Sequence, residues 1–265
     1  MTTPRPLPSA ETTVSALATL DARGWNCIDF ISDLHLCEQH PRTFDAWRQH
    51  LETTPAQALF ILGDLFEVWV GDDVLDDPSS TFERACVDVL RRAADRMTVH
   101  FLCGNRDFLA GDTLMQRTGM RALNDPTLLQ LEKQRVLLSH GDAWCLGDHD
   151  YLAFRAEVRS PVWQQSFLAR PLPERLALAR EMRSASESRK RTHTAYADVD
   201  ETLASRWLAA CGAQVLVHGH THRPATHTLP LGQTRWVLSD WEADATPPRQ
   251  QVLRWQVEWQ RIDLR

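Results

Sequence analysis

The chain has 265 residues, of which 43% are hydrophobic and 24% charged, a balance that predicts a folded globular protein and excludes wholesale disorder. Acidic residues number 35 against 29 basic ones, and the formal net charge of −6 argues against nucleic acid as a partner. No apolar run approaches the roughly 18 residues of a membrane-spanning helix, and residues 1–25 lack the pattern of a secretory signal. Six scattered cysteines without a C-x-x-C pair predict reduced thiols in a cytoplasmic protein.

The predicted elements alternate between strands and helices. Residues 1–25 are rich in Pro, Ser and Thr, and we expect a loose leader there, followed by one domain over residues 26–265. A helical pattern over 81–96 begins with Ser80 and Glu83, the spacing of a capping box. Short apolar runs rich in branched and aromatic side chains predict strands at 27–32, 58–62, 98–103, 135–139, 214–218, 235–239 and 251–259. This alternation predicts α/β layers around a central sheet.

The segment from about 150 to 205 differs, because it contains no strand-like run and is rich in Arg, Ala and Leu. We expect a helical lid inserted here, covering one side of the α/β core. Between residues 170 and 191, seven basic residues stand against three acidic ones, which makes a local charge of +4. Two interpretations fit: a helical cap with a solvated charged face, or a surface that meets acyl chains and anionic lipid head groups.

Metal-binding residue types follow five of the predicted strands, each at the carboxyl end of its strand. They are Asp33 and His35, Asp64, Asn105, His140, and His220 with His222, and the cationic Arg106 directly follows Asn105. Ligands of open α/β sheets gather at this edge, so we expect the five segments to converge on one site. Neighbouring glycines permit tight turns and close approach of the backbone.

The donor set comprises four His, two Asp and one Asn, which is more than one tetrahedral zinc ion takes. It suits two ions about 3.5–4 Å apart, bridged by a carboxylate and open to water and substrate. Mixed imidazole and oxygen ligands favour Mn, Fe, Co or Zn over Ca or Mg. Each motif alone is typical of a turn or of a surface histidine. Together, in this order and each after an apolar run, the motifs predict a two-metal site.

These motifs resemble those of the calcineurin-like metallophosphoesterases, and most closely the UDP-2,3-diacylglucosamine pyrophosphohydrolase family of lipid A biosynthesis. The stretches that carry the resemblance, within roughly residues 27–242, are Ile31–Leu36, Ile61–Glu67, Gly71–Asp73, Gly104–Leu109, His140–Asp142 and His218–Ala225. The resemblance implies a four-layered sandwich core with a helical lid, and two Mn²⁺ ions. The implied metal ligands are Asp33, His35, Asp64, Asn105, His140, His220 and His222, with Asp64 as the bridge.

The resemblance also implies a reaction, the hydrolysis of the pyrophosphate bond of UDP-2,3-diacylglucosamine to UMP and 2,3-diacylglucosamine 1-phosphate (lipid X). A hydroxide activated by the metals is the implied nucleophile, and the implied catalytic residues are Asp64, Asn105, Arg106 and His140. Many members of the superfamily have a proton-donating His where this chain has Arg106, and Arg stays protonated. A phosphate leaving group tolerates that loss better than an alkoxide does, which favours a pyrophosphate substrate.

Implied substrate contacts lie in both the core and the lid. They are Asn105, Arg106, Asp148, Ser186, Lys190, His193 and His220. The resemblance implies a peripheral protein on the cytoplasmic face of the inner membrane. Its implied partners are the lipid substrate and the membrane surface, and no obligate protein partner is evident.

Two alternatives remain open on the same core. A soluble nucleotide pyrophosphatase or phosphodiesterase predicts activity on water-soluble nucleotides without help from lipid. A scaffold that binds a protein and has lost catalysis predicts that at least one metal ligand is replaced, and none of the seven is.

Overall fold

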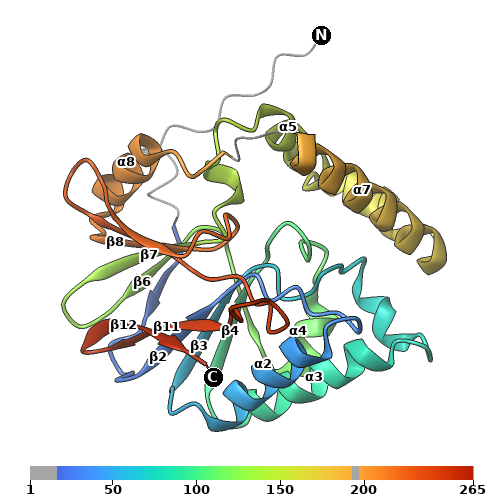
Figure 1. Cartoon of the computed structure of the whole chain (residues 1–265), viewed down its shortest axis with the longest axis horizontal. Helices are drawn as coiled ribbons and strands as arrows, with labels where there is room; N and C mark the ends of the chain where they lie inside the picture. Colours follow the sequence, from blue (N-terminus) through green and yellow to red (C-terminus); the bar gives the residue numbers. More distant parts are fainter. Residues whose placement is uncertain (1–16, 193–196, 265) are drawn as a thin grey trace.

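Two six-stranded β-sheets form the centre of the computed structural model, which describes residues 17–192 and 197–264 (Figure 1). The first sheet has the order β12-β11-β2-β3-β4-β5, with β2 (Ile28–Ile31), β3 (Ala58–Leu62), β4 (Thr98–Leu102), β5 (Arg121–Leu123), β11 (Gln251–Gln256) and β12 (Glu258–Asp263). The second sheet has the order β1-β6-β7-β8-β10-β9, with β1 (Thr19–Asp21), β6 (Thr127–Gln130), β7 (Arg135–Ser139), β8 (Val215–His218), β9 (Ala225–Thr228) and β10 (Thr234–Val237).

Helices cover the outer faces of both sheets, which gives four layers (Figure 1). Helices α2 (Pro41–Thr53), α3 (Thr81–Ala94) and α4 (Asp112–Thr118) pack on the first sheet, and α8 (Glu201–Cys211) packs on the second. Two short 3-10 helices, η1 (Asp72–Asp76) and η2 (Asp142–Trp144), follow β3 and β7. The described chain therefore has the layered α/β architecture that the sequence predicts.

The middle strands are buried on both faces, which explains their continuous apolar sequences. Along β3, Ala58, Phe60 and Leu62 belong to the core between the two sheets, whereas Leu59 and Ile61 belong to the core under the helices. This alternation follows from the pleat of a strand, and each set of side chains meets an apolar layer. Strands β2, β3 and β4 run parallel, so their carboxyl ends lie at one edge of the sheet.

All seven predicted strand regions contain strands, but two details of the prediction are wrong. The region 251–259 forms two antiparallel strands rather than one, because the chain reverses around Val257, whose φ is +67°. Ser80 precedes α3 without a side-chain hydrogen bond, so the capping box does not form. The ψ angle of Ser80 is 56°, outside the extended region from which a capping hydroxyl reaches the first amides of a helix.

Part of the expected leader belongs to the second sheet. Thr19–Asp21 form β1, which pairs in parallel with β6 at the edge of that sheet. The side chains of Leu20 and Ala22 add to the core between the sheets, and this burial stabilises the strand. The range expected to be a loose leader therefore contains a strand of the core.

The lid, which we define as residues 149–192, consists of α5 (His149–Val158), α6 (Pro161–Leu168) and α7 (Leu172–Thr192). Helix α7 extends away from the two sheets (Figure 1). Trp163 and Phe167 of α6 stack with ring centroids 4.7 Å apart, and they pack with Val70 and Leu109 of the core loops. No helix in the described ranges is long and apolar enough to cross a membrane.

Candidate functional site

The polar segments predicted from the sequence converge at the carboxyl ends of five strands. Backbone hydrogen bonds join the loops to one another. The N–H of Asp33 donates to the carbonyl of Gly63 at 3.1 Å, and the N–H of Gly219 donates to the carbonyl of His140 at 3.0 Å. The loops after β2 and β3 are therefore joined to each other by the backbone alone, and so are the loops after β7 and β8.

Unusual backbone conformations are concentrated in this site. Within the described residues, six that are not glycine have positive φ, and one of them is Val257. The other five are predicted metal ligands: Asp33, His35, Asp64, His220 and His222. Their φ angles lie between 48° and 68°, a left-handed region that costs free energy for such residues and is found mostly at functional sites.

Glycines allow the loops to approach this closely. A Cβ atom on Gly104 would lie 2.2 Å from Oδ1 of Asp64, and one on Gly219 would lie 2.3 Å from Oδ2 of Asp33. Both distances are far below van der Waals contact, so a side chain at either position would displace a carboxylate of the site.

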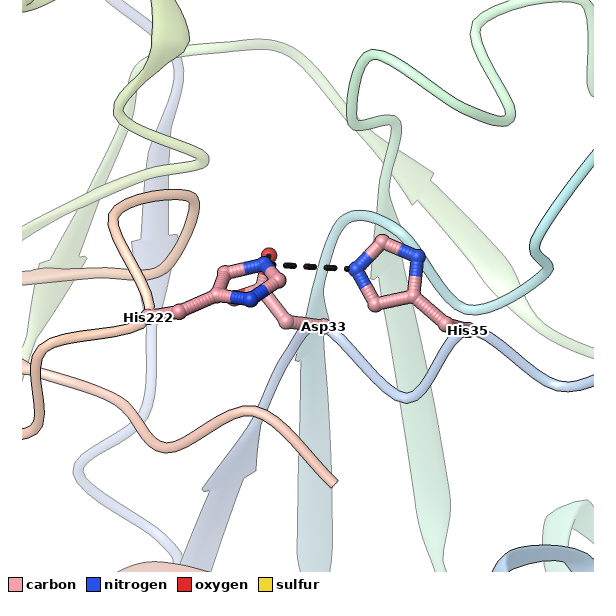
Figure 2. A group of neighbouring side chains, drawn as sticks. All are labelled: Asp33, His35 and His222. Atoms are coloured by element: carbon pink, nitrogen blue, oxygen red, sulfur yellow. Dashed lines mark hydrogen bonds and ion pairs between the residues drawn. The ribbon is translucent and has the colours of Figure 1, made fainter. Parts of the chain in front are cut away.

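Asp33, His35 and His222 form the first group of side chains (Figure 2). Nε2 of His35 lies 3.3 Å from Nε2 of His222, which in turn lies 3.3 Å from Oδ1 of Asp33. The Asp33 carboxylate also accepts the backbone N–H of His220, at 2.9 Å to Oδ2, and the hydroxyl of Ser32 at 2.5 Å. These hydrogen bonds fix the orientation of the Asp33 carboxylate, whose remaining lone pairs face the imidazoles of His35 and His222.

Asn105, His140 and His220 form the second group, and the carboxylates of Asp33 and Asp64 lie next to it. Oδ1 of Asn105 lies 3.0 Å from Nε2 of His140 and 2.9 Å from Nδ1 of His220. Asp64 lies between the two groups, since its Oδ1 is 3.7 Å from Nε2 of His140 and its Oδ2 is 3.8 Å from Nε2 of His35. Each oxygen of this carboxylate therefore faces one group.

The atoms of the second group fit a divalent cation. Nδ1 of His140 donates to the carbonyl of Leu62 at 2.9 Å, so the neutral imidazole carries its lone pair on Nε2. That lone pair faces the Asn105 oxygen and the Asp64 carboxylate, which are hydrogen-bond acceptors as well. A cation among these atoms satisfies all three, and an imidazole with oxygen ligands is the set that manganese and its neighbours accept.

The electrostatics of the site favour positive charge. Burial opposes the ionisation of Asp33, but the hydrogen bond and charges of the nearby histidines hold its pKa well below the usual range. Burial also disfavours protonation of His140, yet the charges of Asp64 and other carboxylates outweigh it and raise its pKa to about 9. Burial, together with the charge on His140, lowers the pKa of His220 to about 4, which leaves that imidazole neutral and able to bind a metal.

Arg106 lies beside the second group. Its backbone N–H donates to Oδ1 of Asp64 at 2.8 Å, which places the residue at the junction of the loops after β3 and β4. Its Nε is buried and has no hydrogen-bond partner among the described residues. Because a guanidinium stays charged, this N–H remains able to donate to an anion.

Two buried aspartates to which the sequence interpretation gave no role organise the site. Asp107 accepts the backbone N–H groups of Leu65 and Gly104, each at 2.7 Å, and so joins the loops after β3 and β4. Asp142 accepts from the hydroxyl of Tyr151 at 2.6 Å and from Nε of Arg155 at 2.7 Å, which attaches α5 to the site. Both aspartates lie inside the motifs named in the sequence analysis, and that position is the signal from which a role could have been predicted.

Of the predicted substrate contacts outside the core motifs, the structure describes the side chain of Asp148 alone. Asp148 is exposed and forms the N-cap of α5, where its carboxylate accepts the backbone N–H of Tyr151 at 3.1 Å. Ser186 and Lys190 belong to α7, but their side chains lie outside the described part of the structure. His193 lies outside the described residues.

Comparisons with known proteins identify similar chains. Residues 28–224 match the family described as calcineurin-like phosphoesterase. A protein of Chromobacterium violaceum named UDP-2,3-diacylglucosamine hydrolase is 47% identical over 223 residues, which cover 81% of this chain and 90% of that protein. Proteins of the same name are 44% identical in Aromatoleum aromaticum, covering 85% of this chain and 91% of theirs, and 43% identical in Xanthomonas axonopodis pv. citri, covering 80% and 90%.

Proposed function

The chain belongs to the calcineurin-like phosphoesterase family, and we propose that it hydrolyses the pyrophosphate bond of UDP-2,3-diacylglucosamine to UMP and 2,3-diacylglucosamine 1-phosphate in lipid A biosynthesis. Relatives named for this substrate share 43–47% identity with the chain. The observation that carries the proposal is the convergence of two carboxylates, four imidazoles and Asn105 beside the charged Arg106.

The proposed cofactors are two Mn²⁺ ions. The proposed ligands are Asp33, His35, Asp64, Asn105, His140, His220 and His222. When bound, such ions supply a nucleophilic hydroxide near neutral pH and neutralise charge on the phosphate oxygens. Asp64 would be the residue that contacts both ions, because one oxygen of its carboxylate lies 3.7 Å from His140 and the other 3.8 Å from His35.

Arg106 is the residue proposed to bind the pyrophosphate. A guanidinium offers two parallel N–H donors that match the oxygens of a phosphate, and its charge opposes the charge that develops in the transition state. It keeps its proton, so it stabilises the departing phosphate by charge and hydrogen bonds rather than by protonation. Asn105 and His220 contact each other and extend this surface toward the substrate.

The lid is proposed to bind the acyl chains and the membrane surface. Phe154, Val162 and Leu168 are apolar residues of α5 and α6 whose exposed fractions are 38%, 79% and 42%. Exposed apolar side chains next to a basic helix suit acyl chains and anionic lipid head groups. This combination supports peripheral binding to the cytoplasmic face of the inner membrane.

Removal of divalent metal tests the proposal. Protein stripped with a chelator is expected to release no UMP from UDP-2,3-diacylglucosamine, and Mn²⁺ is expected to restore release far better than Ca²⁺, because calcium prefers an all-oxygen site. UMP is measured by chromatography. Full activity of the stripped protein, or equal rescue by Ca²⁺, contradicts the proposal, and turnover of water-soluble nucleotides alone supports the soluble pyrophosphatase instead.

A further inference from the structure

Glu67 is a largely covered carboxylate next to the site, and neither the predicted ligands nor the predicted substrate contacts include it. It follows β3, three residues after Asp64, and its side chain is 13% exposed. The backbone N–H of Glu67 donates to the carbonyl of Leu36 at 3.1 Å, and the N–H of Leu36 donates to the carbonyl of Leu65 at 2.9 Å. This short parallel pairing of the loops after β2 and β3 fixes Glu67 beside His35.

The two oxygens of Glu67 have different partners. Oε2 lies 3.0 Å from Nδ1 of His35, whereas Oε1 lies 3.1 Å from Nε of Arg183 and 3.6 Å from Nη1 of Arg106. His35 belongs to the metal-binding group, Arg106 to the loop after β4, and Arg183 to the lid helix α7. One carboxylate therefore touches the metal group, the core arginine and the lid.

The contact with His35 bears on which nitrogen of that imidazole carries the proton: Oε2 of Glu67 is 3.0 Å from Nδ1, close enough for charge attraction, although the pair is not aligned as a hydrogen bond. A carboxylate at Nδ1 holds the proton there and leaves the lone pair on Nε2. Nε2 is the nitrogen that faces His222 at 3.3 Å and Asp64 at 3.8 Å. The Glu67 contact thus orients the imidazole with its lone pair toward the proposed metal position.

The contact with the two arginines has a different consequence. Arg106 and Arg183 carry like charges, and a carboxylate between them allows both to lie at one place. Both guanidiniums then lie at the boundary of core and lid, held by the same carboxylate. Guanidinium N–H groups at this boundary suit the oxygens of the substrate pyrophosphate.

We propose that Glu67 is a positioning residue that orients His35 for metal binding and holds Arg106 of the core and Arg183 of the lid together for the substrate pyrophosphate. The arginine part of this inference rests on the proposed function. The His35 part rests on metal binding alone and needs no substrate.

The test replaces Glu67 by an amide of the same size. In Glu67→Gln, the dissociation constant for Mn²⁺, measured by calorimetry on metal-stripped protein without substrate, is expected to rise about tenfold to a hundredfold, the usual effect of losing a carboxylate behind a metal-binding histidine. Arg183→Met is expected to leave Mn²⁺ affinity unchanged and to raise KM with little change in kcat. Glu67→Gln is expected to raise KM as well, because it loses its contact with Arg183. In the double variant the two increases in KM are expected to be less than additive, because both substitutions remove this contact.

Two further variants keep the result interpretable. Glu52→Gln removes an exposed carboxylate that pairs with Arg48 on α2, and it is expected to change neither Mn²⁺ affinity nor KM. Glu67→Asp retains the charge and is expected to restore most of the Mn²⁺ affinity lost in Glu67→Gln, which a purely structural role does not predict.

The outcomes separate this inference from the proposed function. Folded Glu67→Gln protein that binds Mn²⁺ as tightly as the wild type, with an unchanged KM, overturns the role of Glu67. If the wild type binds Mn²⁺ but releases no UMP, the proposed substrate is wrong, and so is the proposed role of Glu67 toward the two arginines. Weaker Mn²⁺ binding by Glu67→Gln would in that case still support the role of Glu67 toward His35.

Discussion

Asp64→Asn is expected to lower kcat for UMP release by about a thousandfold, because a group that holds both metal ions contributes several kcal/mol to the transition state. The amide keeps the shape of the side chain and can still accept the backbone N–H of Arg106, which donates to Oδ1 at 2.8 Å. Only the negative charge between the two groups of ligands is lost. The measurement is kcat at saturating Mn²⁺, together with the melting temperature.

The melting temperature distinguishes a lost catalytic group from a damaged fold. Burial, together with the negative charge of Asp64, raises the pKa of Asp107 to about 6. Asp64→Asn removes this repulsion between carboxylates and also the attraction between Asp64 and His140, so the melting temperature of the metal-free variant is expected to stay close to that of the metal-free wild type. Asp88→Asn, on the exposed face of α3, serves as the control and is expected to keep full activity. An Asp64→Asn protein with more than about a tenth of wild-type kcat contradicts the role of Asp64.

Arg175→Met is expected to loosen the lid, because Arg175 is 1% exposed and holds α7 to the core. Its guanidinium donates to the carbonyl of Val70 at 2.6 Å and of Arg170 at 3.0 Å, and it pairs with Asp73. Met replaces much of the volume but leaves the buried carbonyl of Val70 without this donor and Asp73 without its ion pair, at a cost of roughly 3 kcal/mol or about a hundredfold in the population of the docked lid. Hydrogen exchange of amides in 161–180 is expected to accelerate by about that factor, and kcat/KM for the acylated substrate to fall.

A matched variant on the same helix isolates this effect. Arg180 is exposed and its Nε donates to the carbonyl of Leu176 within α7, so Arg180→Met removes a basic residue without detaching the helix. Exchange rates in 161–180 are expected to stay within about twofold of the wild type in this variant. Equal exchange in Arg175→Met and Arg180→Met shows that Arg175 does not hold the lid.

The strands and the polar residues that follow them were predictable from local sequence for a physical reason. A strand buried on both faces, such as β3, must be apolar at every position, and this produces a run that stands out from its neighbours. The residues after such runs meet at one edge because parallel strands place their carboxyl ends there. Asp33, Asp64 and His140 could therefore be grouped before any contact was known.

Long-range polar contacts were not predictable in the same way. Arg175 pairs with Asp73 across 102 positions of the chain, and in the sequence it is one of several arginines in a basic helix. Glu67 contacts both the loop after β2 and the lid, and the residues next to it in the sequence do not predict these contacts. Asp148 was interpreted from a resemblance as a substrate contact, whereas the structure adds a local role as the cap of α5.

The most direct test of the central claim is a comparison of UMP release from UDP-2,3-diacylglucosamine and from UDP-glucosamine by the same Mn²⁺-loaded protein. The claim predicts that kcat/KM for the acylated substrate is higher by at least about a thousandfold, since burial of only five methylene groups contributes about 4 kcal/mol. Equal turnover of both substrates, or turnover of neither, contradicts it.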